Sequence, residues 1–328
     1  MKKNPQKISK NGFAVSAAII LLLLLAAFIG TAYYVWKKGM HDDSALINSN
    51  VPAATAAQDN SATTKVDLTK LPLGDGKVTT SGAKKGYVFS CTDNFRGGGA
   101  MHSGGWISGS TWNLEAKPTV EGSVDWPNAK VAITKQGDKR IISGNGLPVD
   151  TMTGIFPIKA GTDAYAYDRN PNSIQAQTVL ASLPANPAAA SMPTCVGLGE
   201  IGYMTNGVAL FNALDAAGRD AAAHEVQDKC DGHPQMQGIY HYHSLSTCLE
   251  KNEGNNQLLG YALDGFGIYG NKDSSGNIIT NSQLDECHGM TSKIQWDGKT
   301  VNMYHYVINH EYPYSIACFR GAPVQTKR

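Results

Sequence analysis

The sequence predicts a mainly β fold with one or a few helices (α+β) that is cross-linked by disulfides. This single domain follows an N-terminal transmembrane helix and is exported. Three observations predict it. Residues 13–36 form a long uncharged segment, all six cysteines follow that segment, and short β-type runs alternate with Gly, Pro and Asn from residue 86 onward. The remaining roughly 245 residues show no internal linker, which favours one large β-rich domain.

Residues 13–36 contain no charged side chain, and at about 1.5 Å per residue such a helix crosses a hydrocarbon core. Four lysines precede the segment and two follow it, so the positive-inside rule keeps residues 1–12 in the cytoplasm. The alternative is a cleaved signal peptide, but the apolar run is long for one, and Tyr33, Tyr34 and Trp36 are typical of an interfacial anchor. We expect a single-pass protein of the cytoplasmic (inner) membrane, with that membrane as a partner.

Residues 37–80 are rich in Ala, Ser, Thr, Asn and Asp without a periodic apolar pattern, which is typical of a flexible linker. Residues 81–328 are the predicted domain, in the periplasm or outside the cell. Beyond the six lysines of residues 1–40, the chain holds 22 basic and 27 acidic side chains, a net charge of −5. This balance argues against a nucleic-acid partner, which calls for a basic face.

All six cysteines fall in the exported part, where an oxidising compartment favours disulfides. They are Cys91, Cys195, Cys230, Cys248, Cys287 and Cys318. Six cysteines allow 15 pairings, and the sequence does not choose among them. Because Cys230 and Cys248 bracket the most histidine-rich stretch, they are the one pair that we expect.

One helix is predicted over residues 218–229, which are rich in Ala and follow Asp215 as a plausible cap. On such a helix Asp228 would share a face with His224 or Glu225. The pattern His224-Glu225-x-x-Asp228 differs from the His-Glu-x-x-His helix of zinc proteases in its second ligand. The metalloprotease interpretation is therefore weak.

The stretch Tyr240-His241-Tyr242-His243 is the centre of the candidate chemistry. Strand side chains alternate, so His241 and His243 should point to one face and the two tyrosines to the other. Two imidazoles on one face are well placed to bind one metal ion. The alternative is that the tyrosines face the core while the histidines lie on a wet surface or bond to carboxylates.

Further ligands for this metal would come from the preceding helix end and turn, which carry Glu225, Asp228 and His233. Mixed nitrogen and oxygen ligation suits zinc or oxidised copper better than calcium. A related stretch, Tyr304-His305-Tyr306-Val307, lies near the end of the chain. It predicts two related strands that face one another.

Several other motifs carry less weight. The G-x-G-x-x-G at residues 197–202 precedes a strand pattern, so it is not a nucleotide site, and the glycines of residues 96–99 indicate a tight turn or a close backbone approach. Asp264 fits either an ordinary Asp-Gly turn or a buried carboxylate that acts as a base. The same ambiguity covers Asp285, Glu286 and His288. The sequence contains no P-loop, G-x-S-x-G, His-Glu-x-x-His or Cys-x-x-Cys motif.

The chain resembles the YHYH-domain family of exported or membrane-anchored bacterial proteins, a family without an established activity. The resemblance runs from about Cys91 to Gly321 and rests on blocks that include NGLPVDTMTGIFPI, QDKCDGHP, GIYHYH, GYALDGFGIYG and LDECHGM. The terminal block of the family often resembles a second Tyr-His-Tyr-His. Here Val307 replaces its last histidine, so a second metal site would be compromised.

The leading hypothesis is an anchored extracytoplasmic domain that binds one transition metal through His241, His243, His233 and Asp228 or Glu225. The first alternative is a metal-dependent hydrolase of an envelope or extracellular substrate, with Glu225 or Asp264 as the general base. The second alternative is a glycan- or protein-binding adhesion module without metal, which would use exposed aromatic side chains such as Trp106, Trp112 and Trp126.

Overall fold

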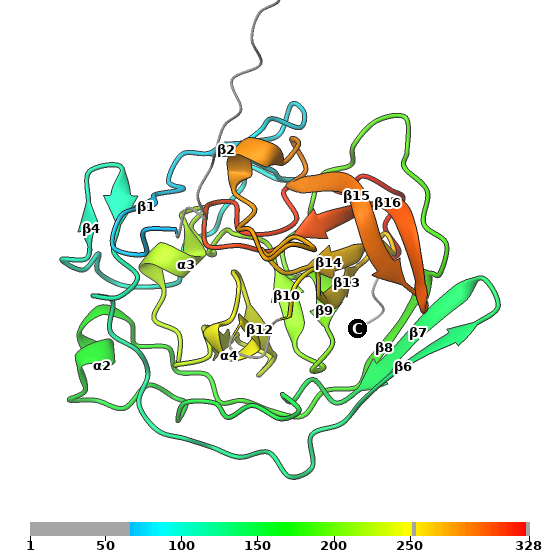
Figure 1. Cartoon of the computed structure of the whole chain (residues 1–328). Coiled ribbons are helices and arrows are strands. Elements are labelled where there is room, and N and C mark those ends of the chain that lie inside the picture. The colour runs from blue at the N-terminus through cyan, green and yellow to red at the C-terminus, as the bar shows by residue number, and fades with distance from the viewer. Residues whose placement is uncertain (1–65, 251–253, 326–328) are drawn as a thin grey trace, which may run out of the picture. The chain divides into compact units, whose positions relative to one another are not determined.

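A computed structural model describes residues 66–250 and 254–325 and shows a mainly β domain with a few short helices (Figure 1). The mainly β fold class predicted from the sequence is thus confirmed. The predicted cytoplasmic residues 1–12 and the predicted transmembrane segment 13–36 lie outside the described residues. Within the described part, no helix combines the length and the apolar character that a membrane span needs.

The largest sheet positions the candidate site. It has eight strands in the order β11-β12-β10-β9-β13-β14-β16-β15. The strands are β9 (Glu200–Met204), β10 (Ala209–Phe211), β11 (Gly232–Pro234), β12 (Tyr240–Tyr242), β13 (Leu258–Ala262), β14 (Gly267–Tyr269), β15 (Gly289–Trp296) and β16 (Lys299–Val307). The aromatic and β-branched residues of these strands supply much of the domain's main hydrophobic core.

This sheet consists of two halves with the same connectivity, β9–β12 and β13–β16. In each half the first two strands form an antiparallel pair, the fourth lies parallel to the second, and the third pairs with the fourth. The halves meet where β9 pairs with β13, with Tyr203 opposite Tyr261. A Cβ atom added to Gly202 or to Gly260 would lie 2.7 Å from a carbonyl oxygen of the opposite half. Both halves therefore need glycine at the same position of their first strand.

The two Tyr-His-Tyr stretches occupy the same place in each half. Tyr240-His241-Tyr242 forms β12, and residues 304–306 lie at the end of β16. Four strands separate β12 from β16 in the sheet. The strands are thus related, as expected, but the prediction that they face one another is wrong because each pairs within its own half.

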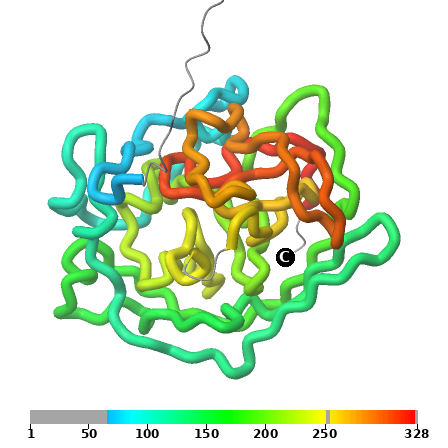
Figure 2. Tube along the Cα trace, viewed as in Figure 1, coloured from blue at the N-terminus to red at the C-terminus, as the bar shows by residue number. Residues whose placement is uncertain are grey.

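Three smaller sheets precede the large one in the chain. One contains β1 (Leu71–Pro72), β5 (Thr111–Trp112) and β4 (Ile107–Ser108); another pairs β2 (Val78–Thr79) with β3 (Val88–Phe89); the third contains β6 (Val131–Gln136), β7 (Lys139–Gly144) and β8 (Val179–Pro184). In Figure 2 the green segment from β5 to β8 runs along the periphery of the later strands. Leu71 is 1% exposed and belongs to the core, so the folded part begins before residue 81, earlier than predicted.

The helices are short: α2 (Asp163–Tyr167), α3 (Ala221–His224), α4 (Thr247–Glu250) and the 3₁₀ turn η1 (Asn281–Gln283). The prediction of a helix over residues 218–229 is wrong in both bounds. The carboxylate of Asp220 caps α3 by accepting from Ala223 N, and Glu225 is already extended at the C-cap. Asp215 instead accepts from the backbone of Ala217 and Arg219 in the preceding turn.

Three disulfides join Cys91 to Cys195, Cys230 to Cys248 and Cys287 to Cys318. The expected pair Cys230–Cys248 is present. It ties the turn before β11 to α4, which follows β12. Cys287–Cys318 ties the turn before β15 to the chain after β16, so each half of the large sheet has its own disulfide in the same place.

Candidate metal centre

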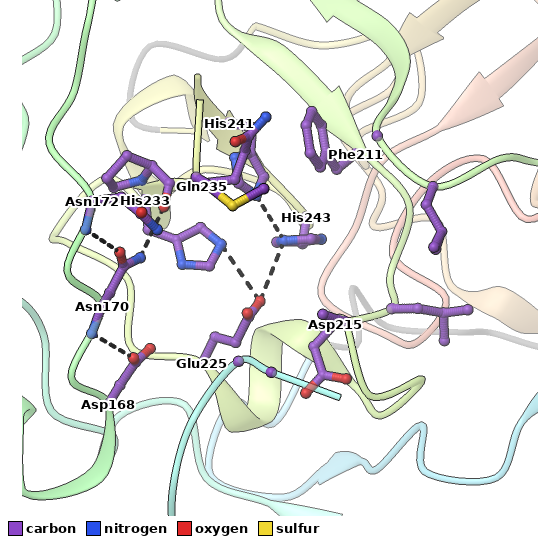
Figure 3. A pocket seen from close by; sticks show the side chains of 18 of the residues that line it. Asp168, Asn170, Asn172, Phe211, Asp215, Glu225, His233, Gln235, His241 and His243 are labelled. Carbon is purple, nitrogen blue, oxygen red and sulfur yellow. Dashed lines mark hydrogen bonds and ion pairs between the residues drawn. The ribbon is translucent and has the colours of Figure 1, made fainter. Parts of the chain in front are cut away.

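Three histidines converge at one end of the large sheet (Figure 3). His241 lies on β12 directly opposite His233 on β11, because these antiparallel strands pair in that register. His243 follows β12 by one residue and points to the same side as His241, as strand alternation predicts. The ring centroids lie 4.6 to 5.3 Å apart, and all three side chains are buried.

The nitrogen atoms of this cluster are oriented by the backbone. His241 Nδ1 donates to Ile239 O at 3.0 Å, and His243 Nδ1 donates to Asn212 O at 2.5 Å. A carbonyl oxygen can only accept, so Nδ1 carries the proton in each neutral ring and Nε2 keeps its lone pair. The two Nε2 atoms lie 3.1 Å apart. Two lone pairs at this distance repel one another unless a proton or a cation lies between them.

His233 completes the cluster without a hydrogen bond of its own. Both of its ring nitrogens are buried, and neither has a hydrogen-bond partner within the described part of the chain. Burial, together with His241 and His243 nearby, lowers its pKa well below the ordinary value. Burial likewise lowers the pKa of His241, and it lowers the pKa of His243 to about 4. The three rings are therefore neutral at pH 7, the form in which imidazole binds a metal.

Glu225 is the carboxylate that reaches these rings. Its Oε2 lies 3.5 Å from His233 Nε2 and 3.5 Å from His243 Nε2. Two ligands held about 2.0–2.1 Å from one zinc ion in a tetrahedral site lie roughly 3.3 Å apart. Relative to His233 and His243, Glu225 thus lies at nearly the spacing of a further ligand. Burial, followed by the nearby Asp215 and Asp168, raises its pKa well above the usual range, and a bound cation would favour its ionised form.

Asp228, the other predicted carboxylate ligand, does not join the cluster. Its oxygens accept from the Tyr240 hydroxyl at 2.9 and 3.0 Å and from the backbone amides of Gly154, Cys230 and Gly232. Because Tyr240 points to the opposite face of β12 from His241, its partner Asp228 lies behind the strand. The structure corrects this part of the predicted ligand set and gives Asp228 a structural role.

The remaining predicted candidates also lie elsewhere. Asp264 accepts from the Tyr306 hydroxyl at 2.6 Å and from Gly321 N at 2.9 Å in the second half of the sheet. Asp285 holds a turn there, and His288 contacts Val307 O. The side chain of His224 contacts Asp75 instead of the cluster. Because α3 ends at His224, the His-Glu-x-x-Asp stretch does not form a protease helix.

A cleft of about 770 Å³ opens onto the cluster. The three histidines and Glu225 line it together with Phe211, several amide side chains and the glycines of residues 97–99 (Figure 3). A Cβ atom added to Gly99, whose φ is +76°, would lie 3.0 Å from Glu225 Oε1 and 2.9 Å from Asp215 Oδ2. The glycine-rich segment therefore serves a close backbone approach, one of the two readings that its sequence allowed.

Two features of the site had no signal in the sequence. Phe211 on β10 stacks on His241, with ring centroids 3.9 Å apart. Lys117 is buried beside the segment that carries Glu225, where its ammonium donates to Ala222 O and to the side chain of Gln227. Burial lowers the pKa of Lys117 to about 8. Both residues come from stretches that read as ordinary strand or loop sequence.

The comparison with known families agrees with the resemblance found in the sequence. Residues 180–281 match the model of the family described as YHYH protein. No curated protein and no solved structure matches the chain. The matched residues include β9–β14 and all four residues of the histidine and glutamate cluster. The resemblance to the YHYH family is confirmed for residues 180–281, which match its model.

Proposed function

We propose that this domain binds one transition metal ion, zinc or copper, through His233, His241 and His243, with Glu225 as the fourth ligand. The observation that carries the proposal is His233, whose two buried ring nitrogens lack a hydrogen-bond partner in the described chain. A buried polar group without a partner costs about 1–3 kcal/mol. A metal bound to Nε2 would offset that cost at this one nitrogen and would also separate the lone pairs of His241 and His243.

The second half of the sheet offers a control for the test. His305 on β16 corresponds to His241 on β12, and its Nδ1 donates to Met303 O as that of His241 donates to Ile239 O. The full chain should be produced by export with its disulfides formed and purified without a histidine tag. Elemental analysis should give close to one metal ion per chain, and this metal should be lost in His241→Ala/His243→Ala but kept in His305→Ala. A folded wild-type protein without metal affinity would contradict the proposal.

A hydrolase remains a second candidate because the proposed metal lies at the floor of a cleft large enough for an organic substrate. Glu225 is the general base that this candidate retains. Asp264 drops out because its carboxylate is bonded to Tyr306 and Gly321 in the other half of the sheet. The variant Glu225→Gln separates the roles. As a fourth ligand Glu225 sets the metal affinity, so that affinity should fall; as a base it would leave the affinity intact and abolish turnover.

The adhesion module receives less support. Trp106 and Trp112 are 6% and 2% exposed and belong to the core. The indole of Trp106 donates to Ala223 O at 2.8 Å, which fixes it against α3. Of the three tryptophans considered, only Trp126 is partly exposed. Two of the three are thus unable to contact a glycan or a protein partner.

We further propose that residues 13–36 anchor the domain on the outer side of the cytoplasmic membrane. Three disulfides and the absence of any free cysteine among the described residues support an oxidising compartment. Thiol labelling of the full chain taken directly from cells, before and after reduction, tests this. Six thiols should become reactive only after reduction, whereas six reactive thiols in the unreduced protein would contradict export.

A further inference from the structure

Two methionines stand at the cleft that leads to the histidine cluster. Met101 is 49% exposed and Met236 is 79% exposed, and both line this cleft. A methionine normally buries its side chain in a core. Met236 is two residues past the end of β11, the strand that carries His233, and Met101 follows the glycine-rich segment that covers Glu225. We call this pair the methionine rim.

The backbone holds one side of the rim in place. The amides of Met101 and His102 both donate to Tyr167 O, at 2.8 and 3.2 Å, and the side chains of both residues are exposed. The exposed thioether of Met101 is a soft donor. Soft thioether ligands select monovalent copper, whereas zinc prefers imidazole, thiolate and carboxylate. Imidazole accepts both zinc and copper, so the floor of the cleft can receive the ion that the rim selects.

We propose that the thioethers of Met101 and Met236 form a transient binding site at the mouth of the cleft, which captures monovalent copper and transfers it to the histidine cluster. The inference rests on the proposed function, because the histidines are the destination of the ion. The order of the donors along the cleft supports it. The two exposed thioethers meet solvent first, and the three neutral imidazoles lie buried at the floor. No covalent or redox step is needed, since copper(I) exchanges from sulfur to nitrogen ligands.

The competing explanation is that the rim is an apolar wall for an organic ligand, because Leu198, which is 51% exposed, also lines the cleft. Leucine and methionine have nearly the same volume and polarity, so a methionine-to-leucine change preserves an apolar wall and removes only the sulfur. Met192, which is 75% exposed and lies outside the cleft lining, supplies a matched control.

The experiment follows the transfer of copper(I) from its coloured bicinchoninate complex to the full, disulfide-bonded chain by stopped-flow absorbance without oxygen. We expect Met101→Leu/Met236→Leu to slow the transfer about tenfold and to leave the zinc affinity of the chain unchanged. Met192→Leu should behave as wild type. Circular dichroism and zinc affinity report whether each variant is folded.

An unchanged transfer rate in the double leucine variant would overturn the proposal, and so would a wild-type chain that binds zinc but takes no copper(I). Neither result would contradict the proposed histidine site. That site fails separately if His241→Ala/His243→Ala keeps the zinc affinity of the wild type. The two failures are thus distinguishable within one set of proteins.

Discussion

The two halves of the large sheet share their architecture and differ in the residues at the candidate site. Asp228 and Asp285 each accept from the amides two and four residues later and from the hydroxyl of a strand tyrosine, Tyr240 or Tyr304. In both halves the residue before the strand glycine has a positive φ, +62° at Asp231 and +67° at His288. What the halves share is therefore the framework of the fold.

The differences fall on the metal ligands. In the register that pairs His233 with His241, the second half pairs Met290 with His305. Val307 stands where the first half has His243. Among the described residues, the first half alone brings three metal-binding side chains together. The comparison teaches that Asp228 belongs to the framework, whereas His233 and His243 are specific to one half.

Removing a ligand should have the largest effect. His233→Ala leaves two imidazoles and one carboxylate, so we expect the zinc affinity to fall by more than about 100-fold, since losses outside the ligand shell alone cost about 10- to 100-fold. Met290→Ala, the same position in the second half, should leave the affinity unchanged. Competition with a chromophoric chelator measures both variants, and equal affinities would break the comparison.

Restoring ligands to the second half should create a weaker site. Met290→His and Val307→His place two imidazoles beside His305 in the register of the first half. We expect the zinc content at saturation to rise from one to two ions per chain, as measured by elemental analysis after dialysis. If it stays at one, the two halves differ in more than their ligands.

The framework carboxylates should affect stability and not metal specificity. Asp228 is 1% exposed, so Asp228→Ala leaves four donors without their acceptor and should lower the free energy of unfolding by about 3 kcal/mol. Asp285 is partly exposed, so Asp285→Ala should cost about 1–2 kcal/mol. Urea unfolding of the metal-free variants provides these values. A fully stable Asp228→Ala protein that has lost only its metal would return Asp228 to the ligand set.

Acid should lower the free energy of unfolding of the metal-free protein, because each half of the sheet contains a buried neutral histidine. Burial lowers the pKa of His243 and of His288 to about 4, against about 6.5 in an unfolded chain. As the pH falls, these rings bind protons in the unfolded chain before they do so in the folded one. The free energy of unfolding is therefore highest above pH 6.5 and decreases between pH 6.5 and about 4. At pH 5 each ring should have lowered the free energy of unfolding by about 2 kcal/mol.

The variant His288→Asn removes the titrating ring of the second half. Asparagine is chosen because it tolerates the positive φ of that position. Its unfolding free energy should fall between pH 7 and pH 5 by about 2 kcal/mol less than that of the wild type. Urea unfolding at the two pH values measures the difference. An identical fall in both proteins would show that His288 does not titrate in this range.

The sequence predicted the parts of this account that depend on local periodicity. Strand alternation placed His241 and His243 on one face, and the position of Cys230 and Cys248 around the histidines indicated their disulfide. His233 and Glu225 were expected nearby because they are close in sequence. Their convergence was harder to derive, since it needs the antiparallel register of β11 with β12 and the early end of α3 at His224.

The predictions from the sequence were wrong where one local pattern fits two different structures. The Ala-rich stretch of residues 218–229 favoured a long helix, but Asp220 caps it late and the chain turns extended at Glu225. Asp228 has the residue type and the spacing of a ligand. Only the tertiary fold shows that Tyr240 and three backbone amides already bind its carboxylate. The relation between the two halves was visible in the sequence only as a short repeated stretch, because the strand pairing that the halves share is a property of the fold.

The ligands of the bound metal can be counted directly. X-ray absorption spectroscopy of the zinc-loaded full chain, purified without a histidine tag, counts imidazole ligands by their multiple scattering. We expect three imidazoles and one oxygen ligand at about 2.0–2.1 Å from the zinc. A spectrum with fewer than three imidazoles, or one dominated by sulfur, would contradict it.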